Sequence, residues 1–186
     1  MIGRSVERMP YPVINTLFDE LLPSGLRHCW KGVFNRWIPD EAIDVHMGYG
    51  ATLPSVESAT LVFPIDGACH RDAPTDTAFA HRDADFAVVV GASWHHPSDD
   101  EANIAWSRDY HRALRPHSLG GAYINFSSDD DARQVKENYS INYPRLVEIK
   151  QRYDPTNLLC LNQSIAADTA TSSTPARDTQ RTRGSS

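Results

Sequence analysis

The 186-residue sequence lacks most of the features that mark membrane proteins, disulfide scaffolds and nucleotide-binding loops. No apolar run approaches the roughly eighteen residues that a membrane-spanning helix requires. Neither a G-x-G-x-x-G nor a P-loop pattern is present. Cysteine is scarce, and Cys29, Cys69 and Cys160 are widely spaced, with no C-x-x-C pair. We therefore expect neither a disulfide framework nor a zinc ribbon, and each cysteine is interpreted as a small core residue.

The charge balance argues against a nucleic-acid partner. The formal net charge is −6, whereas phosphate binding requires clustered Lys and Arg. The charged start, Met1–Arg8, is not followed by an apolar segment, so no secretory signal is expected. A hydrophobic content of 40% and a charged content of 23% fit a soluble globular protein of one ordinary domain, cytoplasmic by default.

Apolar residues at helical spacing predict several helices. The predicted segments are 14–21, which Pro23-Ser24-Gly25 stops, a segment beginning after Pro39, 103–114, and 143–153. Asp154-Pro155 ends the last one, because a proline ring disfavours helical conformation in the residue before it. The apolar residues that follow are expected to be anchored in a core: Leu158, Leu159, Leu161 and Ile165.

Short runs rich in β-branched and aromatic residues predict strands at 59–63, 86–90 and 122–126. They lack regular βαβ spacing, which indicates an α+β fold with an antiparallel or mixed β-sheet covered by helices. Residues 166–186 contain no Val, Ile, Leu, Met or aromatic residue, so we expect a disordered C-terminal tail after one domain over residues 1–165.

Beyond these patterns, the order of residue identities in the last predicted helix and its stop is distinctive. YPRLVEIKQRYDPTNLL, at 143–159, is closed by LNQSI at 161–165. This string closely resembles the C-terminal signature of the berberine-bridge-enzyme-like, FAD-linked oxidases. Other family-like segments occur in matching order: GLRHCWKG at 25–32, Gly67-Ala68, TAFAHR at 77–82, Trp94, Trp106 and GGAYINF at 120–126. The resemblance covers roughly residues 11–165.

The resemblance implies a two-domain architecture. An N-terminal domain carries FAD, a second α+β domain covers the flavin ring as the substrate-binding, berberine-like part, and the last segment returns to the flavin domain. This sequence matches only the second domain and the last segment, which returns to the flavin domain. It therefore resembles a truncated or split family member, with FAD held mainly by a domain absent from the chain and a separate flavin-domain chain as a possible partner. The face that would contact such a domain is expected to be an exposed apolar patch.

Family chemistry is the dehydrogenation of a small organic substrate, in which a base takes a proton while hydride passes to the flavin. In many members a tyrosine of a Y-x-N-Y motif serves as that base or helps it. Tyr123 matches this tyrosine, and Asn125 follows as a substrate-binding candidate, whereas Phe126 stands where a second tyrosine is found. A phenol is a poor base unless positive charge or hydrogen bonds stabilise the phenolate. The alternative is that Tyr123 is a buried strand aromatic with a satisfied hydroxyl.

His81 and Arg82 are the other substrate-binding candidates. A histidine can orient the substrate or accept a proton, and an arginine can hold a carboxylate or stabilise a phenolate. Alternatively, both are polar residues at a strand entrance, satisfied by the backbone and by Asp83 or Asp85.

Three amides match polar positions of the C-terminal signature and are cofactor-binding candidates for FAD: Asn142, Asn162 and Gln163. Amide groups can bond a cofactor or fix the return segment itself, and both interpretations stay open.

His95-His96, followed by Asp99, Asp100 and Glu101, raises the question of a metal site. Adjacent histidines on a strand point to opposite faces, and the acidic residues are better explained as favourable charges at a helix N-terminus. No metal is expected.

Three hypotheses follow. The chain is the substrate and C-terminal part of an FAD-dependent oxidoreductase, a non-catalytic remnant or small-molecule-binding module of the same fold, or a small metal-dependent hydrolase that uses the His-rich middle. The first explains the ordered motifs.

Overall fold

A computed structural model describes residues 8–14, 16, 19, 23–128, 132–160 and 163–165. Its helices and strands are, in chain order, α1 Tyr11–Ile14, β1 Arg27–Asn35, α2 Asp40–Gly50, β2 Ala59–Pro64, β3 Phe86–Trp94, α3 Asp100–Leu114, α4 Ala132–Tyr139 and α5 Tyr143–Tyr153. Short 3₁₀ turns connect them: η1 Gly67–His70, η2 Pro97–Asp99, η3 Arg115–His117, η4 Ile124–Phe126 and η5 Ser140–Asn142. No helix of the described ranges is long and apolar enough to cross a membrane.

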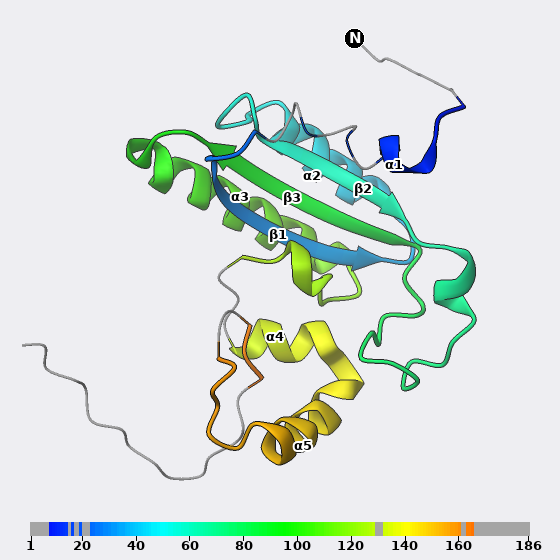
Figure 1. The fold of residues 1–186 in the computed structure, drawn as a ribbon. Helices are drawn as coiled ribbons and strands as arrows, with labels where there is room; N and C mark the ends of the chain where they lie inside the picture. Colours follow the sequence, from blue (N-terminus) through cyan, green and yellow to red (C-terminus); the bar gives the residue numbers. More distant parts are fainter. Residues whose placement is uncertain are drawn as a thin grey trace, which may run out of the picture.

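The strands form an antiparallel sheet with the order β1-β3-β2 (Figure 1). In the central strand β3, residues 87–94 are buried, which explains the uninterrupted apolar run that predicted this strand. Val88 lies opposite Val33 of β1 and Val62 of β2, so these side chains share one face of the sheet. The predicted α+β class with an antiparallel sheet and helices is confirmed.

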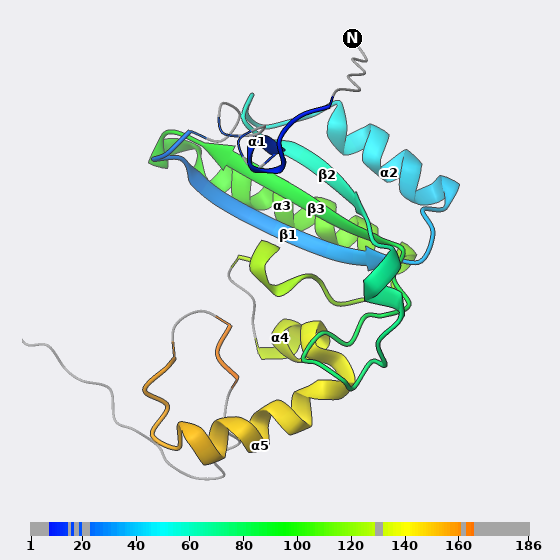
Figure 2. The same ribbon diagram turned by 45° about the vertical axis from the view of Figure 1, so that its right-hand side comes forward.

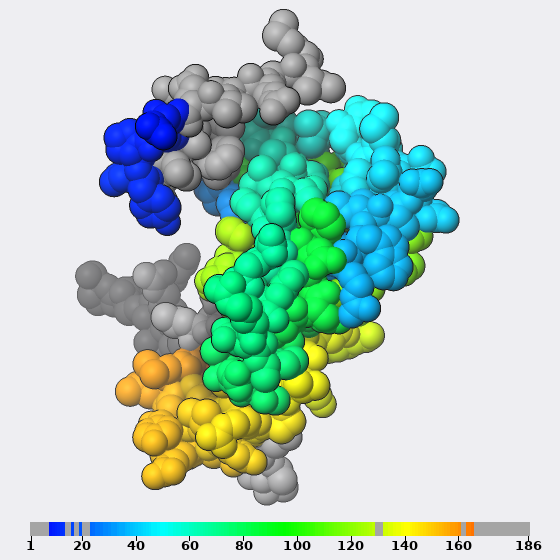
Figure 3. All heavy atoms as spheres, turned by 90° about the vertical axis from the view of Figure 1, so that its right-hand side faces the viewer, coloured from blue at the N-terminus to red at the C-terminus, as the bar shows by residue number. Residues whose placement is uncertain are grey.

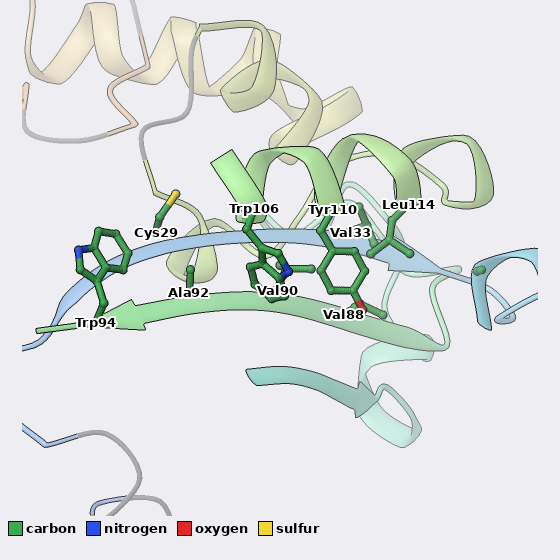
Figure 4. Close-up of a cluster of buried hydrophobic side chains, with 10 residues drawn as sticks. Cys29, Val33, Val88, Val90, Ala92, Trp94, Trp106, Tyr110 and Leu114 are labelled. Atoms are coloured by element: carbon green, nitrogen blue, oxygen red, sulfur yellow. The ribbon is translucent and has the colours of Figure 1, made fainter. Parts of the chain in front are cut away.

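Helix α3 covers that face and forms the main core. Trp106, Tyr110 and Leu114 point from α3 onto β1 and β3, where they meet Val33 and Val88 (Figure 4). Further members of this cluster are Cys29, Ala42, Val90, Ala92 and Trp94. The i, i+4 and i+8 spacing of the three α3 residues produced the periodic pattern that predicted this helix.

Helix α2 packs beside α3 through an aromatic contact. Tyr49 stacks on Tyr110 with ring centroids 4.5 Å apart and an interplanar angle of 3°. The Tyr110 hydroxyl lies 2.5 Å from Nδ1 of His46 and 3.4 Å from the Thr60 hydroxyl, so it is satisfied inside the core. Burial lowers the pKa of His46 and raises that of Tyr110, which keeps both groups neutral near pH 7.

Helices α4 and α5 lie beyond the β1 edge of the sheet, away from β2 (Figure 2). Segment 65–85, drawn in turquoise and green in Figure 3, runs from the sheet down to these helices. Asn142 fixes this contact, because its buried side-chain amide donates to the carbonyl groups of Pro74 at 2.7 Å and Thr77 at 3.0 Å. Arg115 also pairs with Glu137 of α4 at 2.8 Å.

The predicted strand at 122–126 is wrong. Gly120 and Gly121 have φ values of 77° and 65°, and the chain then closes the turn η4, in which the Phe126 amide donates to the Tyr123 carbonyl at 2.9 Å. Left-handed glycines redirect the chain before a strand can form. Strand β1 was not predicted, because its charged and polar residues obscure the strand pattern.

The expectation that Leu158 and Leu159 are buried is also wrong, since they are 81% and 75% exposed. Both backbone amides donate to the Asp154 carboxylate, at 2.7 and 2.9 Å, and the Lys150 ammonium binds the same carboxylate. This ion pair at the end of α5 turns the backbone inward and leaves the leucine side chains outside. These contacts, led by the Lys150 hydrogen bond, lower the pKa of Asp154.

The predictions for the cysteines and for the two ends of the chain have mixed outcomes. Cys29 is a core residue, Cys69 is half-buried, and Cys160 is exposed, which contradicts its expected core position. Ile165 is partly buried, whereas Leu161 lies outside the described residues. The predicted helix at 14–21 is described only around α1, and residues 166–186 also lie outside the described part of the chain.

Leu114→Ala should lower the free energy of unfolding by about 3 kcal/mol, because Leu114 is 2% exposed and its truncation leaves a cavity under α3. The matched control is Leu158→Ala, which removes an exposed leucine and should change stability by less than about 0.5 kcal/mol. Urea unfolding followed by circular dichroism measures both. Equal losses would contradict the described core.

Candidate functional site

An apolar cleft of about 450 Å³ opens on the face of the sheet opposite α3. We call it the Tyr123 cleft. Its aromatic lining residues are Phe34 of β1, Phe63 of β2, Phe79 of segment 65–85, and Tyr123 and Phe126 around η4. Ile65, Cys69, Arg82 and Ala87 complete it. The cleft therefore gathers residues from distant parts of the chain around one phenol.

Backbone geometry places Tyr123 at this cleft. The buried Asn138 side chain accepts a hydrogen bond from the Ala122 amide at 2.8 Å, which fixes the residue before Tyr123. Ala122 also sits against the sheet, because a Cβ added at Gly32 would lie only 3.1 Å from its Cβ. Glycine at 32 thus allows the close approach of the Tyr123 segment to β1.

The Tyr123 hydroxyl accepts a hydrogen bond from Nδ2 of Asn125 at 2.8 Å. The Asn125 amide therefore fixes the position of the phenol oxygen at the mouth of the cleft. The Tyr123 residue is 41% exposed. The observed exposure differs from the alternative of a fully buried aromatic.

Phe126 frames the phenol. Its ring stacks on Phe63 with centroids 5.7 Å apart and an angle of 9°, and it meets Tyr123 edge-on at 5.3 Å. Where the family motif has tyrosine, this phenylalanine supplies an apolar wall instead of a second hydroxyl.

His81 lies behind the cleft and does not line it. Its ring is buried, stacks on Phe34 at 4.6 Å, and donates from Nε2 to the Asn138 carbonyl at 3.1 Å. Burial lowers the pKa of His81, although the backbone contacts oppose this effect. His81 is therefore neutral near pH 7 and links the sheet to α4.

Arg82 lines the cleft, but its guanidinium is engaged with segment 65–85. It donates to the carbonyls of Phe79 and Cys69, both at 3.1 Å, and to the Thr77 hydroxyl at 2.6 Å. It also lies over the Phe79 ring, 5.0 Å from the centroid. Arg82 also pairs with Asp72 at 3.6 Å, so its role is to hold one wall of the cleft.

The amide candidates occupy different places. Asn142 uses its side-chain nitrogen to hold segment 65–85. Gln163 donates to the Ser127 carbonyl, so the end of the described chain returns to the residue that follows Phe126. Asn162 lies outside the described residues.

A second concave region of about 310 Å³ adjoins the first, and we call it the His28 hollow. It is lined by His28, Trp30, Asn125, Phe126, Ser127 and Ser128. Sequence reasoning did not assign His28 or Trp30 a role, although both belong to the family-like segment 25–32. Their alternation along β1 places them on the same face as Phe34 and was the available signal.

The His-rich middle forms separate pairs. His95 pairs with Glu57 at 3.0 Å, and Asp100 binds Arg27 and the Trp94 indole. Throughout the described ranges, no three His, Cys, Asp or Glu side chains gather closely enough to hold a metal ion.

Comparison with known proteins finds similarity to one family model and to FAD-linked oxidoreductases. The family model described as "Berberine and berberine like" matches residues 122–166, which include Tyr123, Asn125 and α5. An FAD-linked oxidoreductase of Dictyostelium discoideum is 24% identical over 86% of this chain and 35% of its own length. The FAD-linked oxidoreductase YvdP of Bacillus subtilis is 30% identical over 68% of this chain and 28% of its own.

Solved structures agree in fold. Aclacinomycin oxidoreductase superposes with a TM-score of 0.60 at 25% identity, over 77% of this chain and 33% of its own. BBE-like #28 from Arabidopsis thaliana gives a TM-score of 0.66 at 22% identity, over 76% and 34%. The chain spans about a third of the length of the relatives it matches.

Gly121→Ala should destabilise the protein by at least about 2 kcal/mol, because the residue has a positive φ and its new Cβ would lie 2.6 Å from the His81 ring. Gly120→Ala is the matched control, since it has a positive φ but open space around the added Cβ, and should cost about 1 kcal/mol. Chemical unfolding measures both. Equal losses would contradict the packing of residue 121 on His81.

The rates at which the cysteines react with a thiol reagent test whether the cleft is accessible. In the native chain a thiol reagent should label Cys160 first and Cys69 more slowly, whereas Cys29 should react only after unfolding. Saturating benzyl alcohol, an uncharged aromatic suited to an apolar cleft, should slow the labelling of Cys69 and leave that of Cys160 unchanged. Mass spectrometry of the labelled peptides gives the rates. Unchanged Cys69 labelling would argue against an accessible cleft at this residue.

Proposed function

We propose that this chain, which belongs to the berberine-bridge-enzyme-like FAD-linked oxidases and matches their C-terminal part, forms the substrate-binding side of an FAD-dependent oxidoreductase. Its substrate is a hydroxylated small organic molecule. Residues 1–165 form the substrate-binding, berberine-like domain of this proposal. FAD is held mainly by a part of the family's fold that this chain does not match, supplied by a flavin-domain partner.

The observation that carries the proposal is the position of the Tyr123 hydroxyl. It stands at an apolar cleft and accepts a hydrogen bond from Asn125, in a residue that is partly exposed. A substrate ring can occupy the aromatic walls while its hydroxyl group meets the phenol oxygen. Cleft, base and donor are thus brought together by residues 120–126 and the sheet.

The chemistry is the oxidation of an alcohol to a carbonyl compound. Tyr123, as phenolate, takes the hydroxyl proton, and the carbon gives up its hydrogen with both bonding electrons. The acceptor for that hydride would be supplied by bound FAD, with oxygen or another acceptor as the final oxidant. Asn125 holds the phenol oxygen in place, while the aromatic walls orient the substrate and exclude water.

The two described amide candidates fit a cofactor contact unequally. The Asn142 side-chain nitrogen is already shared between carbonyl groups of segment 65–85, so this residue supports the cleft wall. Gln163 lies next to Ser127, close to the Tyr123 surface, and its amide oxygen remains able to accept a hydrogen bond. We assign Gln163 the flavin-side contact within this proposal.

Tyr123→Phe should lower the rate of flavin reduction by substrate about 100-fold or more, because it removes the proton acceptor and keeps the ring. The chain would be co-purified with the part of the FAD-linked oxidoreductase YvdP that it does not match. Anaerobic stopped-flow absorbance would record flavin reduction by a panel of aromatic alcohols.

Tyr153→Phe is the matched control, since this tyrosine is 73% exposed on α5 and outside the cleft. Both variants should retain the flavin spectrum of the parent complex. An unchanged rate in Tyr123→Phe would remove Tyr123 from the base role. A complex that binds FAD but is reduced by no alcohol would favour the non-catalytic binding module instead.

A further inference from the structure

The sheet has one covered edge and one open edge. At the β1 edge, the Phe34 carbonyl accepts a hydrogen bond from the Leu119 amide, and the Trp30 carbonyl accepts one from the Ser128 amide, both at 2.8 Å. Strand β2 forms the opposite edge. Soluble proteins usually protect such an edge with charged residues, bulges or an interior proline, because an unprotected edge can pair with another strand.

The backbone of β2 presents unpaired groups along its outer side. The Ile65 amide donates to the Asp85 carbonyl at 2.7 Å and continues the β2–β3 register, so Ile65 is turned toward β3. Because successive residues of an antiparallel pair alternate, Thr60, Val62 and Pro64 point their backbone groups away from β3. No partner of these groups is found within the described ranges. The strand has no charged residue, and its proline is its last residue, so we call β2 the open edge.

Helix α2 lies along the open edge, on the same side of the sheet as α3 (Figure 2). His46 of α2 and Thr60 of β2 both contact the Tyr110 hydroxyl, at 2.5 and 3.4 Å. Val45 and Tyr49 pack against the main core. The helix is therefore fixed over β2 with one side turned to α3 and the other turned outward beyond the edge.

The outward side of α2 is apolar. Ile43 and Met47 are one turn apart and lie on the side of the helix opposite Val45 and Tyr49. They are 46% and 71% exposed, and Val62 of β2, on the same face of the sheet, is 44% exposed. Ile43, Met47 and Val62 thus form an exposed apolar stripe directly beside the unpaired backbone groups.

The open edge is complementary to itself. When two copies pair antiparallel about a twofold axis at Val62, each Val62 amide meets the Val62 carbonyl of the other copy. Thr60 then lies opposite Pro64, so the Thr60 amide meets the Pro64 carbonyl, and the N–H that proline lacks falls at the end of the ladder. This axis is perpendicular to the sheet, so both copies keep α2 on one face and bring Ile43 and Met47 toward their equivalents.

We propose that the open edge is a self-association surface, through which two copies of this chain join into one six-stranded antiparallel sheet with the order β1-β3-β2-β2-β3-β1. Backbone hydrogen bonds of β2 set the register, and the apolar stripe of each copy covers that of the other. This inference does not depend on the proposed function.

The size of the surface sets the expected affinity. The patch is ~20 Å long, the length of the six-residue strand, and about 20 Å high across the sheet and one helix layer, so each copy contributes roughly 400 Å². Stable interfaces commonly use about 800 Å² from each partner. We therefore expect a reversible dimer that forms in the micromolar to millimolar range and not a permanent one.

Sedimentation equilibrium of the full chain over a series of concentrations should show a monomer–dimer equilibrium. Val62→Lys places two like charges together at the twofold axis and should weaken dimerisation about tenfold or more. The matched control is Leu158→Lys, which also replaces an exposed apolar residue by a charge, but in the turn after α5, and should leave the equilibrium unchanged. Circular dichroism checks that both variants are folded.

An exchange measurement tests the same surface without a substitution. Hydrogen exchange of the Thr60 and Val62 amides, followed by NMR in the unsubstituted chain, should become slower as the protein concentration rises. Exchange of the exposed Leu158 amide region should not depend on concentration.

Disulfide crosslinking tests the register, in a chain that carries Cys160→Ser to remove the exposed native thiol. Residues opposite each other in a hydrogen-bonded pair have Cα atoms about 5.5 Å apart, which a disulfide can span. Val62→Cys should therefore crosslink to its equivalent under mild oxidation. Thr60→Cys should not, because the two copies of residue 60 lie roughly 14 Å apart in this register.

Several outcomes would overturn the proposal. These are a monomer at every concentration, a dimer that Leu158→Lys dissociates and Val62→Lys does not, or equal crosslinking by Val62→Cys and Thr60→Cys. Protection of the Thr60 and Val62 amides only after the unmatched part of YvdP is added would assign the open edge to a flavin-domain partner instead. None of these results depends on whether Tyr123 acts as the base.

Discussion

The contact between the Asn138 side chain and the Ala122 amide is the interaction on which the candidate site depends. Asn138 lies on α4, yet its oxygen fixes the backbone directly before Tyr123, and its own carbonyl receives the His81 ring. A buried amide that lost this partner would carry the full cost of desolvation. The small helical part and the sheet are thus joined at the point where the phenol is positioned.

Most helices and strands could be predicted from the apolar patterns in the sequence. Strand β3 and helix α3 had a clear apolar pattern because they bury their side chains against each other and against β1. Strand β2 and helix α5 were also predicted from their patterns, although neither contains a buried residue. The strand expected at 122–126 failed for a local reason. Its alternation resembled a strand, but two left-handed glycines immediately before it determine the chain direction, and this conformation carries no hydrophobic pattern.

The candidate site was only partly predictable. Tyr123, Asn125 and Arg82 were found from motif identity, and the structure gathers them at one cleft or beside it. Phe63, His28 and Trp30 escaped notice because their roles arise from strand pairing and from the turn that brings Phe126 across the sheet. His81 and Asn142 show the converse. A polar residue in a family motif can be used entirely to position the wall of a site.

The Lys150–Asp154 pair orders the backbone of Leu158 and Leu159, the two leucines that follow α5, while their side chains stay exposed. All the groups that organise this turn lie within ten residues of one another, so it can form locally as the helix ends. Leu158 and Leu159 are consequently displayed with their backbone already immobilised. Any surface that later covers them gains the full benefit of removing two large side chains from water, with the loss of backbone freedom already incurred during folding.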